Sequence, residues 1–124
     1  MEKLALVFVG GGLGAVARYL VSTALIPRVA GTFPLGTFIV NVTGSFLIGF
    51  AMALLTERFQ ADPRWRLFLV VGILGGYTTF SSFEYETYQS FKHGYNTIAL
   101  LYVLSSVVAG YAALLLGTAL AAKR

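Results

Sequence analysis

The polar and apolar residues of this chain fall into long blocks. Four strongly apolar runs, at about residues 4–26, 36–56, 67–91 and 97–121, are separated by short polar connections. The hydrocarbon core of a bilayer is spanned by about 20 mainly apolar helical residues. The pattern therefore predicts an all-α membrane protein, with four transmembrane helices in a single domain over residues 1–124.

The third apolar run has an unusual centre. Residues 75–83 read GGYTTFSSF, two glycines followed by threonines, serines and aromatic residues that are poor helix formers. We predict a break in this helix near residues 75–79, at mid-membrane depth. Unpaired backbone groups at that depth are tolerated only where they are buried in protein or bind an ion.

The composition excludes several classes of site. The chain has no cysteine, so it forms neither disulfides nor thiolate metal sites, and its single histidine, His93, makes no metal site alone. The glycine string at residues 10–14 follows no strand and lacks the lysine of a phosphate-binding loop. With no serine, histidine and acid constellation either, we do not expect an enzyme.

The net charge of +4 comes from basic residues spread over the termini and the connections rather than gathered in a patch for nucleic acid. One side of the membrane would carry Lys3, Arg58, Arg64, Arg66, Lys123 and Arg124, and the other Arg28 and Lys92. Cytoplasmic loops are enriched in Lys and Arg, so the pattern favours cytoplasmic termini in a cell membrane.

Two polar residues lie deep within the predicted spans. Arg18 is too far from its helix end to reach water easily from a lipid-facing position, so we expect it at an interface or a wet vestibule, where it ties helices or attracts an anion. Asn41 has an amide that suits either an anion or a neighbouring helix. Position alone does not choose between these roles.

Aromatic and hydroxyl groups accompany the predicted break. Phe80 and Phe83 are three residues apart, and two ring edges turned toward a path stabilise a small anion without trapping it, although packing is the commoner role. Tyr102 and Ser106 lie four apart on the last span and offer further hydroxyls.

Small residues at helical spacing, Gly10 with Gly14 and Ser45 with Gly49, permit close helix approach either within one subunit or between two. Four helices enclose little interior, and the chain has no evident internal repeat of the kind that builds a two-half transporter. We therefore expect a second copy to supply the other half.

These residues resemble the Fluc family of fluoride channels, also called CrcB proteins, over essentially the whole chain. The motifs that carry the resemblance are Gly14-Ala15-x-x-Arg18-Tyr19, Gly36-Thr37-x-x-x-Asn41-x-x-Gly44, and the run from Gly75 to Phe83 with Glu86. The run in the third span is the most specific of the three.

The resemblance implies an antiparallel, dual-topology homodimer with two pores that export fluoride passively from the cytoplasm of a bacterium. It implies pore-lining roles for Asn41, Phe80, Phe83, Tyr102, Ser106, Thr37, Thr79, Ser82, Glu86 and Arg18. It also implies a structural sodium ion on the twofold axis, bound by the backbone carbonyls of Gly75 and Thr78.

Three features depart from the family pattern. Glu84 replaces a small residue, Gly110 replaces a hydroxyl, and the basic residues are less balanced than dual insertion ordinarily requires.

The alternative function is a small dimeric proton-coupled multidrug transporter, which needs a carboxylate within the membrane. A plain membrane anchor would have no reason to break its third helix.

Overall fold

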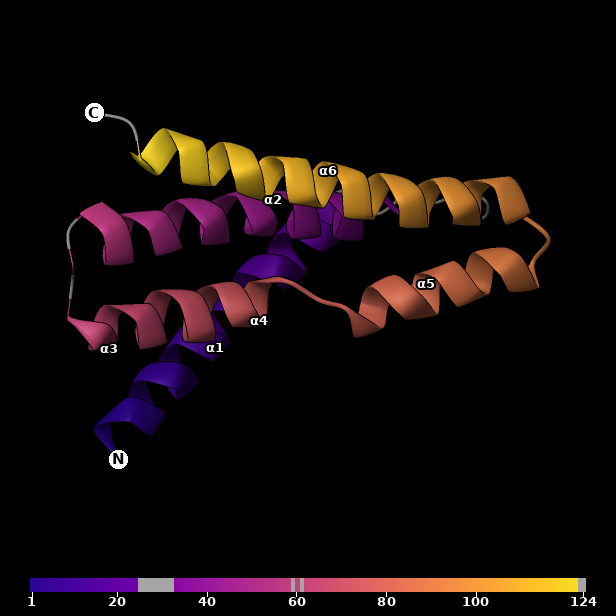
Figure 1. The fold of residues 1–124 in the computed structure, drawn as a ribbon. Coiled ribbons are helices and arrows are strands. Elements are labelled where there is room, and N and C mark those ends of the chain that lie inside the picture. The colour runs from indigo at the N-terminus through magenta and orange to yellow at the C-terminus, as the bar shows by residue number, and fades with distance from the viewer. Residues whose placement is uncertain (25–32, 59, 61, 123–124) are drawn as a thin grey trace.

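The computed structural model describes residues 1–24, 33–58, 60 and 62–122. Its helical elements, in chain order, are α1 (Glu2–Ala24), α2 (Leu35–Met52), η1 (Ala53–Arg58), α3 (Pro63–Trp65), η2 (Arg66–Leu74), α4 (Gly75–Tyr77), α5 (Ser81–Lys92) and α6 (Asn96–Ala122). The segments η1 and η2 are π-helical. In Figure 1, α2 and α6 lie side by side, and α1 crosses the others obliquely.

Within the described residues, four helical stretches are long and apolar enough to cross a membrane: Glu2–Ala24, Leu35–Thr56, Pro63–Lys92 and Asn96–Ala122. The prediction of an all-helical protein with four spans is confirmed. The predicted end of the first span at residue 26 lies outside the described residues, as do Arg28, Lys123 and Arg124 of the charge pattern.

Glycines allow α1 to lie directly against η2 and α4. A Cβ atom added to Gly10 would come within 2.6 Å of the Phe68 carbonyl oxygen and 2.9 Å of the Gly72 Cα atom. A Cβ atom added to Gly14 or Gly76 would likewise collide with backbone atoms of the facing helix. Only glycine permits this backbone approach, so the first small-residue motif packs within one chain.

The same device joins α2 to α6. A Cβ atom at Gly49 would collide with the Leu114 carbonyl, and one at Gly117 would collide with the Phe46 carbonyl. The sequence left open whether Gly49 packs within one subunit or between two, and the structure shows that it packs within the chain. These two glycine contacts hold α2 and α6 together over the half of the molecule that contains the C-terminus (Figure 1).

Helical structure stops at Tyr77 and resumes at Ser81. Thr78 has an extended backbone, with φ −82° and ψ 161°, and Figure 1 shows the chain running as a thin link between α4 and α5. The interruption at residues 78–80 overlaps the break predicted near residues 75–79 only at Thr78 and Thr79, since residues 75–77 are helical. Its depth in a bilayer stays a prediction.

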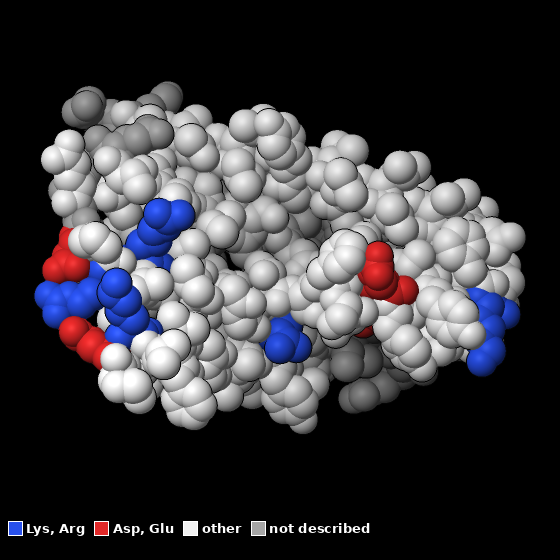
Figure 2. Space-filling view, turned by 60° about the horizontal axis from the view of Figure 1, so that its bottom comes forward, with Lys and Arg blue, Asp and Glu red and all other residues white. Residues whose placement is uncertain are grey.

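Much of the surface is apolar. Phe8 is 82% exposed and Val108 is 68% exposed. On the face drawn in Figure 2, the charged side chains gather mainly at one end, and most of the remaining face is uncharged. Such a surface suits lipid or another membrane helix rather than water.

Candidate functional site

Asn41 holds the interrupted segment in place from α2. Its side-chain amide donates to the Thr79 carbonyl at 2.9 Å, and its side-chain oxygen accepts from the Thr79 backbone N–H at 2.9 Å. This two-way pair satisfies both backbone groups of a residue that has no helical partners. Of the two roles open to Asn41, the structure shows the contact with a neighbouring segment.

The interruption redirects two amides away from their helical acceptors. In a regular α-helix, Thr79 N–H would donate to the Gly75 carbonyl and Ser82 N–H to the Thr78 carbonyl. Here Thr79 N–H donates to Asn41, and Ser82 N–H donates to the Thr79 hydroxyl at 3.2 Å. The carbonyls of Gly75 and Thr78 therefore lose their α-helical donors.

Arg18 reaches the same segment from α1. Its Nε–H donates to the Gly76 carbonyl at 3.0 Å, and the side chain is partly buried. This contact fits the helix-tying role. It also brings a positive charge to the end of α4, where helix carbonyls concentrate partial negative charge.

A cavity of about 340 Å³ lies beside the interruption. Its walls come from α2, η2, the start of α4 and the interrupted segment, and are formed by Asn41, Gly44, Ser45, Ile48, Val70, Leu74, Gly75, Thr78, Thr79 and Phe80. Five of these were predicted site residues. Ser45 and Ile48 were not predicted to lie with them, because both residues fit ordinary helix packing.

A second polar group lies between α2, α5 and α6. The Glu86 carboxylate accepts from the Thr37 hydroxyl at 3.0 Å and from the Tyr102 hydroxyl at 2.7 Å. Tyr102 is fully buried and Thr37 is 5% exposed. Three predicted residues from distant parts of the chain therefore form one hydrogen-bonded cluster.

The predicted aromatic pair links the two groups. The Phe83 ring lies edge-on to the Tyr102 ring, with centroids 4.9 Å apart, and 6.1 Å from the Phe80 ring. Phe83 is half-buried, whereas Phe80 is 69% exposed and lines the cavity. The two rings lie next to each other although Phe80 belongs to the interruption and Phe83 to the first turn of α5.

Ser106 has a buried hydroxyl with no hydrogen-bond partner among the described residues. It lies one turn beyond Tyr102 on α6, so it extends the polar side of that helix. Buried polar groups are normally paired, so this hydroxyl has capacity for a ligand, a water or a group on another chain.

Two contacts went unnoticed in the sequence. The Thr43 and Tyr77 hydroxyls share a hydrogen bond of 2.8 Å next to the interruption, and the Phe33 ring lies edge-on to Tyr102 at 5.4 Å. The hydroxyls of Thr43 and Tyr77 are evident from the sequence, but no local sequence pattern predicts a contact between residues 34 positions apart.

The two residues that differ from the family pattern, Glu84 and Gly110, lie in different environments. Glu84 is exposed on α5 and lines a separate notch of about 320 Å³ with Phe83, Thr87 and Tyr88 among its neighbours. Gly110 is buried on α6, where an added Cβ would meet the Ser45 hydroxyl at 3.4 Å. That position has space for a small side chain.

Comparison with known proteins matches residues 5–118 to the family described as CrcB-like protein, Camphor Resistance (CrcB). A protein of Solibacter usitatus named fluoride-specific ion channel FluC is 58% identical over 119 residues, covering 96% of this chain and 98% of that protein. Proteins with the same name from Acidobacterium capsulatum and Rhizobium meliloti are 48% identical (90% of this chain, 89% of theirs) and 44% identical (97% and 96%).

Proposed function

The chain belongs to the CrcB-like protein family, and we propose that it is a fluoride-specific ion channel, as its relatives are named. It is a multi-pass bacterial membrane protein with four candidate spans. It acts as a channel and not as an enzyme, and the direction of passive flow is out of the cytoplasm. The names of the relatives favour this function over a multidrug transporter.

The observation that best supports a pore is the Asn41–Thr79 pair. It fixes an extended backbone in the wall of the cavity, with the Phe80 ring on the same wall. A narrow anion route needs donors and positive ring edges that are held in place before the ion arrives, since mobile groups would lose entropy on each passage.

The route continues from Phe80 to Phe83 and then to the cluster of Thr37, Glu86 and Tyr102. The Thr37 and Tyr102 hydroxyls donate hydrogen bonds to the Glu86 carboxylate here, and such hydroxyls are suited to replace part of the hydration shell of fluoride. Thr79, Ser82 and Ser106 add hydroxyls along this path, and Arg18 raises the local positive potential.

A second copy of the chain completes the pore in this proposal. Phe80 lines the open cavity and is 69% exposed, so that side of the cavity is available to another subunit. An antiparallel arrangement, with the copies inserted in opposite directions, would let a twofold axis pass near the interruption and give two equivalent pores.

A structural sodium ion fits the interruption. The Gly75 and Thr78 carbonyls are two of those that lose their α-helical donors at the interruption, and two copies would provide four such oxygens. Carbonyl oxygen is a hard ligand suited to an alkali cation. Bound there, the ion would neutralise carbonyl charge at the subunit interface.

Fluoride efflux from proteoliposomes tests the function. Vesicles loaded with potassium fluoride should release it on addition of valinomycin, as measured by a fluoride electrode, while vesicles loaded with chloride should retain it. Equal efflux of the two anions would remove the claim of selectivity. Cross-linking or light scattering of the same protein would test the dimer, and purification with potassium in place of sodium would test the cation.

A further inference from the structure

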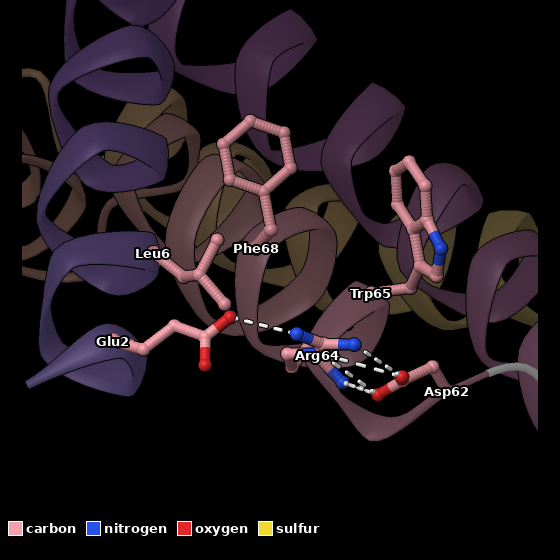
Figure 3. A pocket seen from close by; sticks show the side chains of 6 residues that line it. All are labelled: Glu2, Leu6, Asp62, Arg64, Trp65 and Phe68. Carbon is pink, nitrogen blue, oxygen red and sulfur yellow. Dashed lines mark hydrogen bonds and ion pairs between the residues drawn. The ribbon is translucent and has the colours of Figure 1, made fainter.

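A surface pocket of about 430 Å³ shares no lining residue with the cavity beside Asn41. It is lined by Glu2 and Leu6 of α1 and by Asp62, Arg64, Trp65 and Phe68, which precede or belong to α3 and η2. Figure 3 shows the three charged groups at one end of this pocket and the apolar side chains beyond them.

The charged end is held together by Arg64. Its Nη1 group donates to Glu2 at 2.8 Å and its Nη2 group to Asp62 at 2.9 Å, while Nε lies 3.3 Å from both Asp62 oxygens and donates to them. These bonds use three of the five N–H groups of a guanidinium. Among the described residues, two N–H groups are left for a further acceptor.

The three charges sum to −1, since two carboxylates face one guanidinium. The hydrogen bond from Arg64 holds the pKa of Asp62 below its ordinary value, so this carboxylate is charged at neutral pH. Glu2 is 66% exposed and Asp62 is 45% exposed, so both carboxylates have oxygens accessible to a ligand.

The position of the pocket at the ends of two candidate spans indicates that lipid headgroups surround it. Two candidate spans begin here, at Glu2 and at Pro63, and the ion pair between Glu2 and Arg64 keeps their ends together. Helix ends of this kind lie at the level of the lipid headgroups, and tryptophan is enriched at that level. Trp65 is 53% exposed at this point.

We propose that this pocket binds the headgroup of a zwitterionic phospholipid with a primary ammonium, phosphatidylethanolamine. The ammonium donates hydrogen bonds to the Glu2 and Asp62 carboxylates, the remaining Arg64 N–H groups donate to the phosphate, and the start of an acyl chain lies along Leu6 and Phe68. The two lining carboxylates repel the extra negative charge of an anionic lipid, against the attraction of Lys3 and Arg66, which adjoin Glu2 and Trp65 in the sequence. A trimethylammonium group has no N–H to donate, so phosphatidylcholine binds more weakly.

The chain contains one tryptophan, so the fluorescence of Trp65 reports on this pocket alone. The protein is reconstituted in phosphatidylcholine vesicles that contain either phosphatidylethanolamine or phosphatidylcholine with brominated acyl chains, at equal mole fraction, and quenching is compared. A third series uses brominated phosphatidylglycerol. Choline is also cationic, so the difference lies in the N–H groups that it lacks; one hydrogen bond contributes about 0.5–1.5 kcal/mol, so the ethanolamine lipid should be enriched at Trp65 at least roughly twofold.

The double variant Glu2→Gln, Asp62→Asn should quench equally with the ethanolamine and choline lipids. Asparagine still caps the start of α3 by accepting from Arg64 N–H, so the fold is retained. Glu84→Gln removes an exposed acid elsewhere and should keep the preference. Equal quenching by the two lipids in the unaltered protein, a preference for phosphatidylglycerol, or a preference that persists in the double variant would each overturn the proposal.

Fluoride efflux is measured on the same vesicles. The pocket shares no residue with the cavity beside Asn41, so the double variant should conduct as the unaltered protein does. A loss of lipid preference with intact efflux supports the headgroup site alone. Absence of fluoride efflux in all samples would refute the proposed function and leave the lipid result to stand by itself.

Discussion

Replacing Asn41 by aspartate changes one atom of the side chain that holds the interrupted segment. Aspartate keeps an oxygen that accepts from Thr79 N–H, but it turns a second oxygen toward the Thr79 carbonyl, where the amide now donates at 2.9 Å. Loss of the hydrogen bond costs about 0.5–1.5 kcal/mol, and the unsatisfied carbonyl costs about 1–3 kcal/mol more. We expect the free energy of unfolding to fall by about 2–4 kcal/mol.

The effect on fluoride flux should be larger than this destabilisation suggests. A fixed negative charge passed by fluoride at about 4 Å raises the barrier by about 4 kcal/mol at an effective dielectric constant of about 20. Each 1.4 kcal/mol is about a factor of ten in rate, so flux should fall about a thousandfold. The measurement is initial fluoride efflux from proteoliposomes at equal protein content, with size-exclusion elution as the check of assembly.

Two further variants separate charge from loss of packing. Asn41→Ala removes both hydrogen bonds without adding a charge, and it should retain more flux than the aspartate. Gln89→Glu makes the same amide-to-acid change on α5, where the amide donates to Tyr85 rather than to the interruption, and should conduct normally. An assembled Asn41→Asp channel with the flux of the unaltered protein would refute the reasoning.

Three other substitutions test separate parts of the structure. Phe80→Ile should cut fluoride efflux while the assembly elutes unchanged, because Phe80 is 69% exposed and contributes a ring edge rather than core packing; normal efflux would show that the ring is not needed. Tyr102→Phe removes the 2.7 Å hydrogen bond to Glu86 and should lower the free energy of unfolding by about 1.5–3 kcal/mol, measured in detergent; Tyr111→Phe, exposed on the same helix, should change little, and equal effects would contradict the role of the Glu86 cluster. Gly14→Ala should destabilise by about 1–3 kcal/mol or more because its Cβ meets the Ile73 carbonyl, whereas Gly12→Ala, with open space around it, should melt at the temperature of the unaltered protein or above.

The elements followed from local properties of the sequence. Each apolar run is long enough to span hydrocarbon, and each ends where polar residues, glycine or proline gather, so the number and approximate bounds of the helices needed no knowledge of their packing. The weak helix formers around Thr78 likewise marked the interruption in advance. These are properties of a few neighbouring residues.

The identity of most candidate site residues also came from the sequence, but their partners did not. Resemblance to a family indicated Thr37, Glu86 and Tyr102 one by one, whereas their union in a single cluster depends on α2, α5 and α6 lying together. For Asn41 the residue type allowed an anion or a neighbouring helix, and only its distance to Thr79 revealed the contact.

The sequence by itself thus determined that the chain is a four-span helical membrane protein, that its third span contains weak helix formers around Thr78, and which polar residues lie within the spans. Tertiary structure decided which backbone groups Asn41 and Arg18 bind, that Gly14 and Gly49 pack within the chain, and that Phe80 is exposed while Phe83 meets Tyr102. The physical reason is the sequence separation over which each interaction acts. Helix formation and transfer into hydrocarbon depend on residues within a few turns, whereas a hydrogen bond between positions 38 residues apart depends on how whole helices pack.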